Sequence, residues 1–239
     1  MDVSAAAKFY SAVFGWEAVE STMTDTPYLL FQIEGRDVAA AYPVSGEERH
    51  EPPHWNSYVS VASADETASR AVSLGGTIVD APFDVIDAGR MAVLQDPTGA
   101  AVCLWEAKGH VGAEVLNEEG ALCWSELSTT DPEAAERFYT ALFGWTAKHG
   151  PQLDEYVEFL NQDDPIAGMI QIEPEWGQLA SNWMPYFAVG NVDDALELVL
   201  DNGGSTIVPA FDIPNVGRMA IAHDPQGALF GLFSVSEAA

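Results

Sequence analysis

Apolar and polar residues along this chain follow helical and strand-like patterns in turn, and the same order of patterns occurs twice. Near the N-terminus Phe9, Val13 and Phe14 recur at helical spacing, which predicts a helix that Asp2 caps and Gly15 ends. Short apolar-rich runs bounded by turn residues follow, and these are typical of strands. We predict strands over 16–20, 28–34, 37–42, 54–62, 77–81, 90–94 and 101–106, and a second helix over 65–74.

Short framework motifs of the first half recur almost letter for letter in the second half. Three pairs of segments match: 7–16 with 136–145, 89–92 with 217–220, and 96–100 with 224–228. The offset is 138 − 9 = 129 at the first pair and 218 − 90 = 128 at the second, so two copies of one folded unit are present. Helices are therefore predicted near 132–143 and 192–202 as well.

The repeat predicts an α+β fold of two tandem domains, residues 1–108 and 121–239, with a linker over 109–120. The second copy opens with an apolar-rich strand over 121–127, whose counterpart in the first copy would lie before Met1. We therefore expect the first domain to lack its first strand. An open sheet edge of this kind invites pairing with another chain, so a homodimer is a possible assembly.

Charge and hydropathy exclude several classes of partner. The chain has 9 Lys and Arg against 37 Asp and Glu, a formal net charge of −28. Such a surface repels nucleic-acid phosphates and anionic membranes, so neither is expected as a partner. No apolar run approaches the roughly 18 residues that a membrane span needs, and the first residues carry no signal-peptide pattern, so a cytoplasmic protein is expected.

The two cysteines, Cys103 and Cys123, lie in strand-like runs and form no CxxC pair. Buried, reduced thiols are the expectation. A bridge between them would require neighbouring strands, which the sequence alone does not show.

The ordered motifs resemble those of one superfamily. An "FY…FGW" first helix, a Gly-Gly pair after the second helix and a "DPxGA" hairpin occur in that order in both copies, at 9–16, 75–76 and 96–100 in the first. This set is similar to the vicinal oxygen chelate superfamily, which holds glyoxalase I, extradiol dioxygenases and bleomycin-resistance proteins. The resemblance covers nearly the whole chain. It implies paired βαβββ modules that curl into a cupped mixed sheet around a small-molecule pocket.

The metalloenzymes of that superfamily bind a divalent ion with His and Glu side chains. The resemblance places their ligand positions at Trp124, Asn56, Met184, Cys103 and Gly231. None of these is His, Asp or Glu, the ligands that such ions prefer. No metal and no other cofactor is therefore expected.

Two residues are candidates for acid–base catalysis. Glu126 lies two residues after Trp124, on the same face of an otherwise apolar strand, where burial would raise its pKa. The alternative is a structural carboxylate paired with Arg218. His54 lies two residues before Asn56, and its alternative is a solvated loop.

Arg90 and Arg218 occupy equivalent strand positions, in the same sequence frame in both copies. Either could anchor a carboxylate or oxyanion of a ligand. The favoured interpretation is a structural pair with a nearby acid, such as Asp84 or Asp212.

The function expected from these observations is metal-free binding of a small molecule, apolar or aromatic, in a cupped sheet. The alternative is a glyoxalase-like lyase or a dioxygenase-type enzyme, including metal-independent acid–base catalysis. The candidate ligand-binding residues are Trp124, Met184, Phe233, Arg218, Asn56, Tyr58, Trp105 and Arg90.

Overall fold

Four modules follow one another along the chain in the computed structural model, which describes residues 2–21, 27–44, 52–150 and 156–235. The first is α1 (Val3–Phe14), β1 (Glu17–Glu20), β2 (Leu29–Ile33) and β3 (Arg36–Ala41). The second is β4 (Tyr58–Ser60), α2 (Ala64–Ser73), β5 (Thr77–Val85), β6 (Gly89–Gln95) and β7 (Ala101–Ala107). The third is β8 (Leu122–Thr129), α3 (Pro132–Phe143), β9 (Thr146–His149), β10 (Tyr156–Asn161) and β11 (Asp164–Gln171). The fourth is β12 (Asn182–Ala188), α4 (Val192–Asp201), β13 (Ser205–Ile213), β14 (Gly217–His223) and β15 (Leu229–Val235).

The helix boundaries follow from their capping residues, as predicted. The Asp2 side chain accepts hydrogen bonds from the backbone N–H groups of Ser4 and Ala5. Gly15 ends the helix at φ 71°, in the left-handed region that glycine adopts without strain. Asp131 and Gly144 do the same for α3, with Gly144 at φ 74°.

The predicted strands are present, with changed bounds. The largest difference is at 54–62, where the regular strand β4 spans only Tyr58–Ser60. Its ladder continues irregularly on both sides, because the Ser57 carbonyl accepts from Cys103 and the Val61 N–H donates to Trp105. In the other direction, β5 extends to Val85, past the predicted end at 81.

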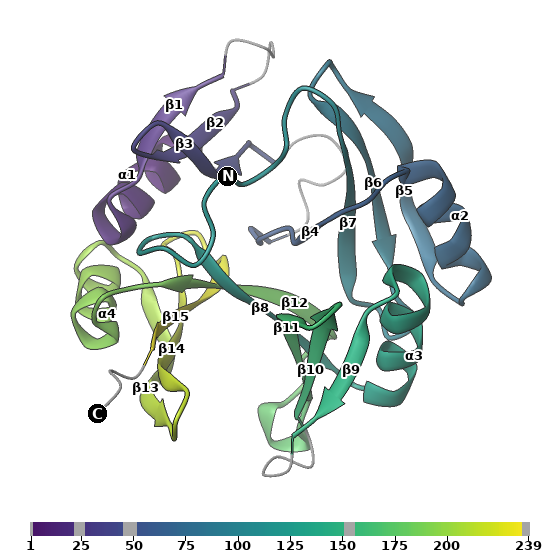
Figure 1. Cartoon of the computed structure of the whole chain (residues 1–239). Coiled ribbons are helices and arrows are strands. Elements are labelled where there is room, and N and C mark those ends of the chain that lie inside the picture. The colour runs from purple at the N-terminus through teal and green to yellow at the C-terminus, as the bar shows by residue number, and fades with distance from the viewer. Residues whose placement is uncertain (1, 22–26, 45–51, 151–155, 236–239) are drawn as a thin grey trace. The chain divides into compact units, whose positions relative to one another are not determined.

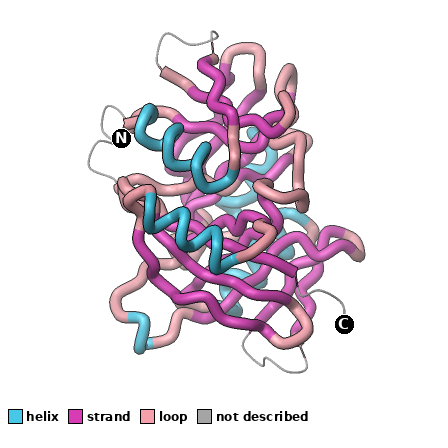
Figure 2. The backbone as a smooth tube through the Cα atoms, turned by 90° about the vertical axis from the view of Figure 1, so that its left-hand side faces the viewer, coloured by secondary structure: helices cyan, strands magenta, loops and turns pink. Residues whose placement is uncertain are grey.

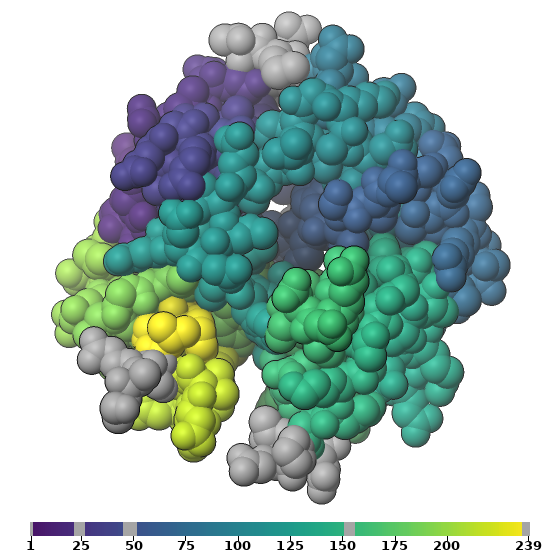
Figure 3. Space-filling model, in the orientation of Figure 1, coloured from purple at the N-terminus to yellow at the C-terminus, as the bar shows by residue number. Residues whose placement is uncertain are grey.

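The chain divides into two compact units, and each combines one module from the first copy with one from the second. Unit 1 comprises residues 1–55, 112–123 and 185–239, and unit 2 comprises 56–111 and 124–184. The first module therefore packs with the fourth, and the second with the third, as the colours of Figures 1 and 3 show. The tandem boundaries at residues 108 and 121 remain a prediction about the repeat.

Unit 1 contains the sheet β1-β2-β3 and the strand sequence β13-β14-β15, which residues 185–188 of β12 continue. Helices α1 and α4 lie side by side on the face seen in Figure 2. Their apolar faces share one core with strand residues, including Phe9, Val13, Val199 and Phe230.

Unit 2 contains the sheet β4-β7-β6-β5 and the strand sequence β8-β11-β10-β9. Its core joins α2 and α3 to the strand faces beneath them, through residues such as Ala68, Leu104, Leu127 and Phe138. The core with α2 and α3 thus occupies one face of these strands, and the opposite face lies away from the two helices.

A crossed contact ties the modules within each unit. In unit 1 the Tyr10 hydroxyl of α1 donates to Asp224 Oδ2 over 3.0 Å, and both residues are buried. In unit 2 Tyr139 of α3 faces Asp96. Trp183 Nε1 donates a hydrogen bond to the Tyr139 hydroxyl over 2.8 Å. The "FY" and "DPxG" motifs therefore meet between copies, which explains why both recur.

The first module has three strands in the part of the chain that is described, as expected. The predicted linker packs beside this module. The Glu114 N–H donates to the Asp37 carbonyl over 2.7 Å, and its carboxylate accepts from the Asp37 N–H over 2.9 Å. Val115 is 1% exposed within the core of unit 1. Within the described ranges, none of the helices is both long and apolar enough to cross a membrane.

Candidate ligand-binding site

The strand face of the third module carries a row of polar side chains in unit 2. The strand register aligns Glu126 of β8 with Gly168 of β11, Gly168 with Glu158 of β10, and Glu158 with Lys148 of β9. Paired residues on neighbouring strands point to the same side of a sheet. Leu127 and Phe159, one position along, belong to the core beneath α3, so the row lies on the face away from that helix.

Two aromatic side chains meet beside this row. Trp124 Nε1 donates a hydrogen bond to the Tyr156 hydroxyl over 3.0 Å. A Cβ atom built on Gly168 would clash with that hydroxyl and lie 2.9 Å from Trp124 Nε1. The Tyr156 hydroxyl can therefore lie against the sheet at this point only because Gly168 has no side chain.

Glu126 interacts with the same phenol. Burial and then the negative charge of Glu126 raise the pKa of Tyr156 well above its ordinary value. The phenol stays protonated at neutral pH. The expected alternative partner of Glu126 is wrong, because the ion-pair partners of Arg218 are Asp193 and Asp212.

Glu158 is held by a cation. Lys148 Nζ lies 2.7 Å from Glu158 Oε2. The charges of Glu158 and Lys148 therefore offset one another, one strand away from Gly168.

A second aromatic contact lies on the strand face of the second module. The rings of Tyr58 and Trp105 meet edge to face, with centroids 6.3 Å apart, and Tyr58 is 46% exposed. Cys103 lies opposite Tyr58 on β7, and burial raises the pKa of its thiol to about 12. Cys103 is buried and Cys123 half-buried, and both thiols are free.

The other predicted residues are dispersed. Asn56 and Met184 belong to unit 2, where Met184 is only 5% exposed. Phe233 belongs to unit 1 and packs over Gly217. His54 is exposed, with its ring Nδ1 2.9 Å from the Pro52 carbonyl, which fits the solvated alternative.

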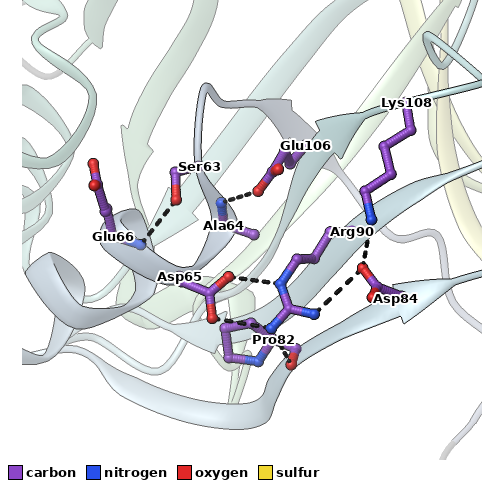
Figure 4. A network of polar contacts seen from close by, with 9 residues as sticks. All are labelled: Ser63, Ala64, Asp65, Glu66, Pro82, Asp84, Arg90, Glu106 and Lys108. Atoms are coloured by element: carbon purple, nitrogen blue, oxygen red, sulfur yellow. Dashed lines mark hydrogen bonds and ion pairs between the residues drawn. The ribbon is translucent and has the colours of Figure 1, made fainter.

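Arg90 connects the start of α2 to the sheet (Figure 4). Its guanidinium donates to both carboxylate oxygens of Asp65, at 2.6 and 3.0 Å, and to the Pro82 carbonyl. Asp84 lies 3.3 Å away and also contacts Lys108. The predicted pairing with Asp84 is present, and Asp65 is the partner that the sequence did not indicate.

Arg218 repeats this arrangement in unit 1. It donates to Asp193 at the start of α4 and to Asp212 on β13, at 2.7 and 2.9 Å. It shares its strand face with Ala220 and Ala222, which belong to the core beneath α4. Both arginines are thus ion-paired on the helix side of their sheets.

Two cavities open on the helix side of the units. One of about 500 Å³ in unit 1 is lined by residues such as Phe14, Gly120, Ala195 and Leu198. The other, of about 420 Å³ in unit 2, lies against Phe138. Neither includes the aromatic and polar groups of the strand faces, where the candidate chemistry lies.

The donor set at the superfamily's ligand positions does not fit a hard divalent cation. Trp124 uses its only polar hydrogen on Tyr156, and Gly231 packs against the Tyr186 ring. The Cys103 thiol is held protonated by its raised pKa. Among the described residues, no three His, Cys, Asp or Glu side chains gather as a metal site.

Sequence reasoning missed Tyr156, Gly168 and Lys148. A comparison of the two copies could have indicated them. The first copy has apolar residues, Ala40, Leu30 and Val19, at the positions that pair in the same register as Gly168, Glu158 and Lys148. The polar row is therefore confined to the second copy.

Comparisons with known proteins agree with this architecture. The family model described as "Glyoxalase/Bleomycin resistance protein/Dioxygenase superfamily" matches residues 1–104 and 121–232. "Putative glyoxylase CFP32" of Mycobacterium bovis is 38% identical over 97% of this chain and 90% of its own length. "Anthracycline biosynthesis protein DnrV" of Streptomyces peucetius is 32% identical over 99% of this chain and 90% of its own length.

A solved structure shows the same fold. The 2,3-dioxygenase LapB of Pseudomonas sp. KL28 superposes with a TM-score of 0.67 at 12% identity, covering 99% of this chain and 89% of that one. With the family model matching both copies, the chain belongs to the glyoxalase/bleomycin resistance protein/dioxygenase superfamily.

Proposed function

We propose that this protein binds a small, flat, largely apolar molecule on the strand face of the third module, without a divalent metal. The observation that carries the proposal is the Trp124–Tyr156 pair seated over Gly168. Trp124 and Tyr156 are half-buried, so neither residue is wholly enclosed by the protein on this strand face. Aromatic side chains suit a flat ligand because ring contacts add to the burial of apolar surface.

The side chains at the superfamily's metal-ligand positions support the proposal that binding requires no divalent metal. The superfamily's ligand positions hold an indole, an amide, a thioether, a protonated thiol and a glycine. The name of a relative, an anthracycline biosynthesis protein, supports a role that involves a small molecule.

Calorimetric titration with naphthylmethanol tests this proposal. We expect binding that survives a chelator and weakens about tenfold or more in Trp124→Phe, because the indole contact and its hydrogen bond to Tyr156 are lost. Trp176→Phe is the matched control, since Trp176 is 47% exposed in the turn Pro174–Trp176. Absence of binding, or binding that a chelator abolishes and a metal restores, would overturn the proposal.

A second candidate is a metal-independent acid–base enzyme. Glu126 touches the Tyr156 phenol, and a carboxylate beside a phenol can pass a proton. The relative named as a glyoxylase favours this candidate. Turnover of an α-oxoaldehyde–thiol adduct that is lost in Glu126→Gln and unaffected by a chelator would establish it.

A further inference from the structure

The cavity of unit 1 is lined by the end of α1 and the start of α4. Its volume of about 500 Å³ is in the range of small-molecule sites. Apolar side chains from both helices form one part of its lining: Val13 and Phe14 from α1, and Ala195 and Leu198 from α4. Leu198 is 41% exposed, so the protein covers this apolar wall only in part. A ligand that enters the cavity would therefore bury apolar surface against both helices.

The charged side chains in the lining are acidic. They are Glu119, in the segment before β8, and Asp194, in the first turn of α4. Glu119 lies over the residue before the cap of α4, because a Cβ atom built on Gly190 would be 3.1 Å from Glu119 Oε1. Acidity is not common to the helix-side cavities of this acidic chain, since the described lining of the cavity in unit 2 includes Arg137 and no acid.

The positive charges of unit 1 lie elsewhere. In its described part, the Lys and Arg side chains are Lys8, Arg36 and Arg218, and none of them lines the cavity. Arg36 Nη2 lies 3.0 Å from Glu118, and Arg218 Nε lies 2.7 Å from Asp193. Lys8 is nearly two turns before the end of α1, about 10 Å along its axis. The two carboxylates of the cavity thus have no ion-pair partner among the described residues.

The helix ends favour a cation at the same place. Gly15, which ends α1, lines the cavity, and the last turn of that helix contains no basic residue. The partial negative charge of its last carbonyl groups is therefore not offset there. At the start of α4 the side chain of Asn191 already accepts from backbone N–H groups, so these are not available to an anion.

We propose that this cavity binds small organic amines, with the protonated amino group at Glu119 and Asp194 and the apolar body against Phe14 and Leu198. A carboxylate accepts charge-assisted hydrogen bonds from an ammonium group, and burial of the apolar body adds affinity. An anionic ligand would be repelled by the lining and by the net charge of −28. The site shares no residue with the strand face of the third module, so it is independent of the proposed function.

The test compares an amine with the corresponding alcohol. Phenethylamine and phenethyl alcohol are titrated against the whole chain at neutral pH, where the amine is protonated. We expect the amine to bind about fivefold more tightly, and only its affinity to fall as salt is raised, because exposed charge pairs are modest and screened. The preference should shrink in Glu119→Gln and in Asp194→Asn. Leu198→Ala should weaken the binding of both ligands alike, because it removes apolar contact and no charge.

Glu197→Gln is the matched control. It removes a charge from an exposed position of α4 that does not line the cavity, and should keep the preference for the amine. A preference lost equally in this control would overturn the inference, because the overall charge of the chain would then explain it. Affinities that stay unchanged in Leu198→Ala and in both carboxylate variants would also overturn it, by placing the ligand elsewhere.

The wild type alone also decides. Equal binding of amine and alcohol, or binding of neither, would overturn the inference and leave the proposed function standing, since that function is tested with naphthylmethanol and Trp124→Phe. If a carboxylate variant does not fold, Leu198→Ala and the salt dependence of the wild type give the answer.

Discussion

Single residues in this chain are explained by what lies over or beside them. Gly168 is a glycine because the Tyr156 hydroxyl occupies the space of a side chain. Tyr10 and Tyr139 are tyrosines because each buried hydroxyl meets a polar partner from the other copy, Asp224 in one case and Asp96 in the other. Burial and these aspartates raise the pKa of both phenols well above its ordinary value.

Removing either hydroxyl should destabilise the fold. Tyr10→Phe leaves the buried Asp224 carboxylate without its phenol donor, and Tyr139→Phe leaves Trp183 Nε1 without its acceptor. We expect a loss of about 1–3 kcal/mol in the free energy of unfolding for each. Urea denaturation followed by circular dichroism measures it.

The control for the two tyrosine variants is Trp176→Phe, at a side chain that is 47% exposed. A loss below about 0.5 kcal/mol at both Tyr10 and Tyr139 would contradict the crossed contact, since that is the range of ordinary surface substitutions.

At the scale of elements, the starts of α2 and α4 are tied to neighbouring strands by one arginine each. Hydrogen bonds from Arg90 and Arg218 lower the pKa of Asp65 and Asp193 respectively. The contribution of these carboxylates to stability is therefore complete above their unfolded pKa, near 4, and is lost as the pH falls through their lower folded pKa.

Replacing the arginines should make the stability of the fold depend less on pH in the acid range. In Arg90→Met and Arg218→Met, the melting temperature should fall less steeply between about pH 5 and pH 3 than in the wild type, because fewer carboxylates have a lowered pKa in the folded state. Calorimetry across that range measures the slope. Arg137→Met, which removes an exposed contact within α3, should keep the wild-type slope.

The sequence predicts these elements well and the site less well, for a physical reason. Helix ends are encoded locally, so Asp2, Gly15, Asp131 and Gly144 identify them correctly. The partners of Arg90 depend on which helix packs against which sheet, so Asp84 was foreseeable within the same hairpin and Asp65 was not. The pairing of Trp124 with Tyr156 requires the order of β8, β11 and β10, which no local pattern contains.

At the scale of the whole molecule, the linear repeat and the compact units do not coincide. Each unit takes one module from each copy, so its core is divided between the two halves of the chain. Phe9 and Phe230 belong to one core, and Leu104 and Phe138 to the other.

The two halves should therefore depend on one another. Residues 1–108 and 121–239, expressed separately, are each expected to expose half of two cores and to unfold without a cooperative transition. Expressed together, they should co-purify through a tag on either half and regain cooperative melting. A half that is monomeric and melts cooperatively alone would show that the tandem boundaries also define the folding units.

The crossed tyrosine–aspartate contacts also bear on how such a chain can diverge after duplication. Tyr10 interacts with Asp224, and Tyr139 interacts with Asp96. A substitution at either tyrosine therefore changes the surroundings of an aspartate in the other copy, so the two copies are coupled at these positions. The strand faces differ between the copies, because Gly168, Glu158 and Lys148 stand where the first copy has Ala40, Leu30 and Val19. The paired contacts therefore constrain the framework of both halves together, while the strand faces can differ between the copies without disturbing them.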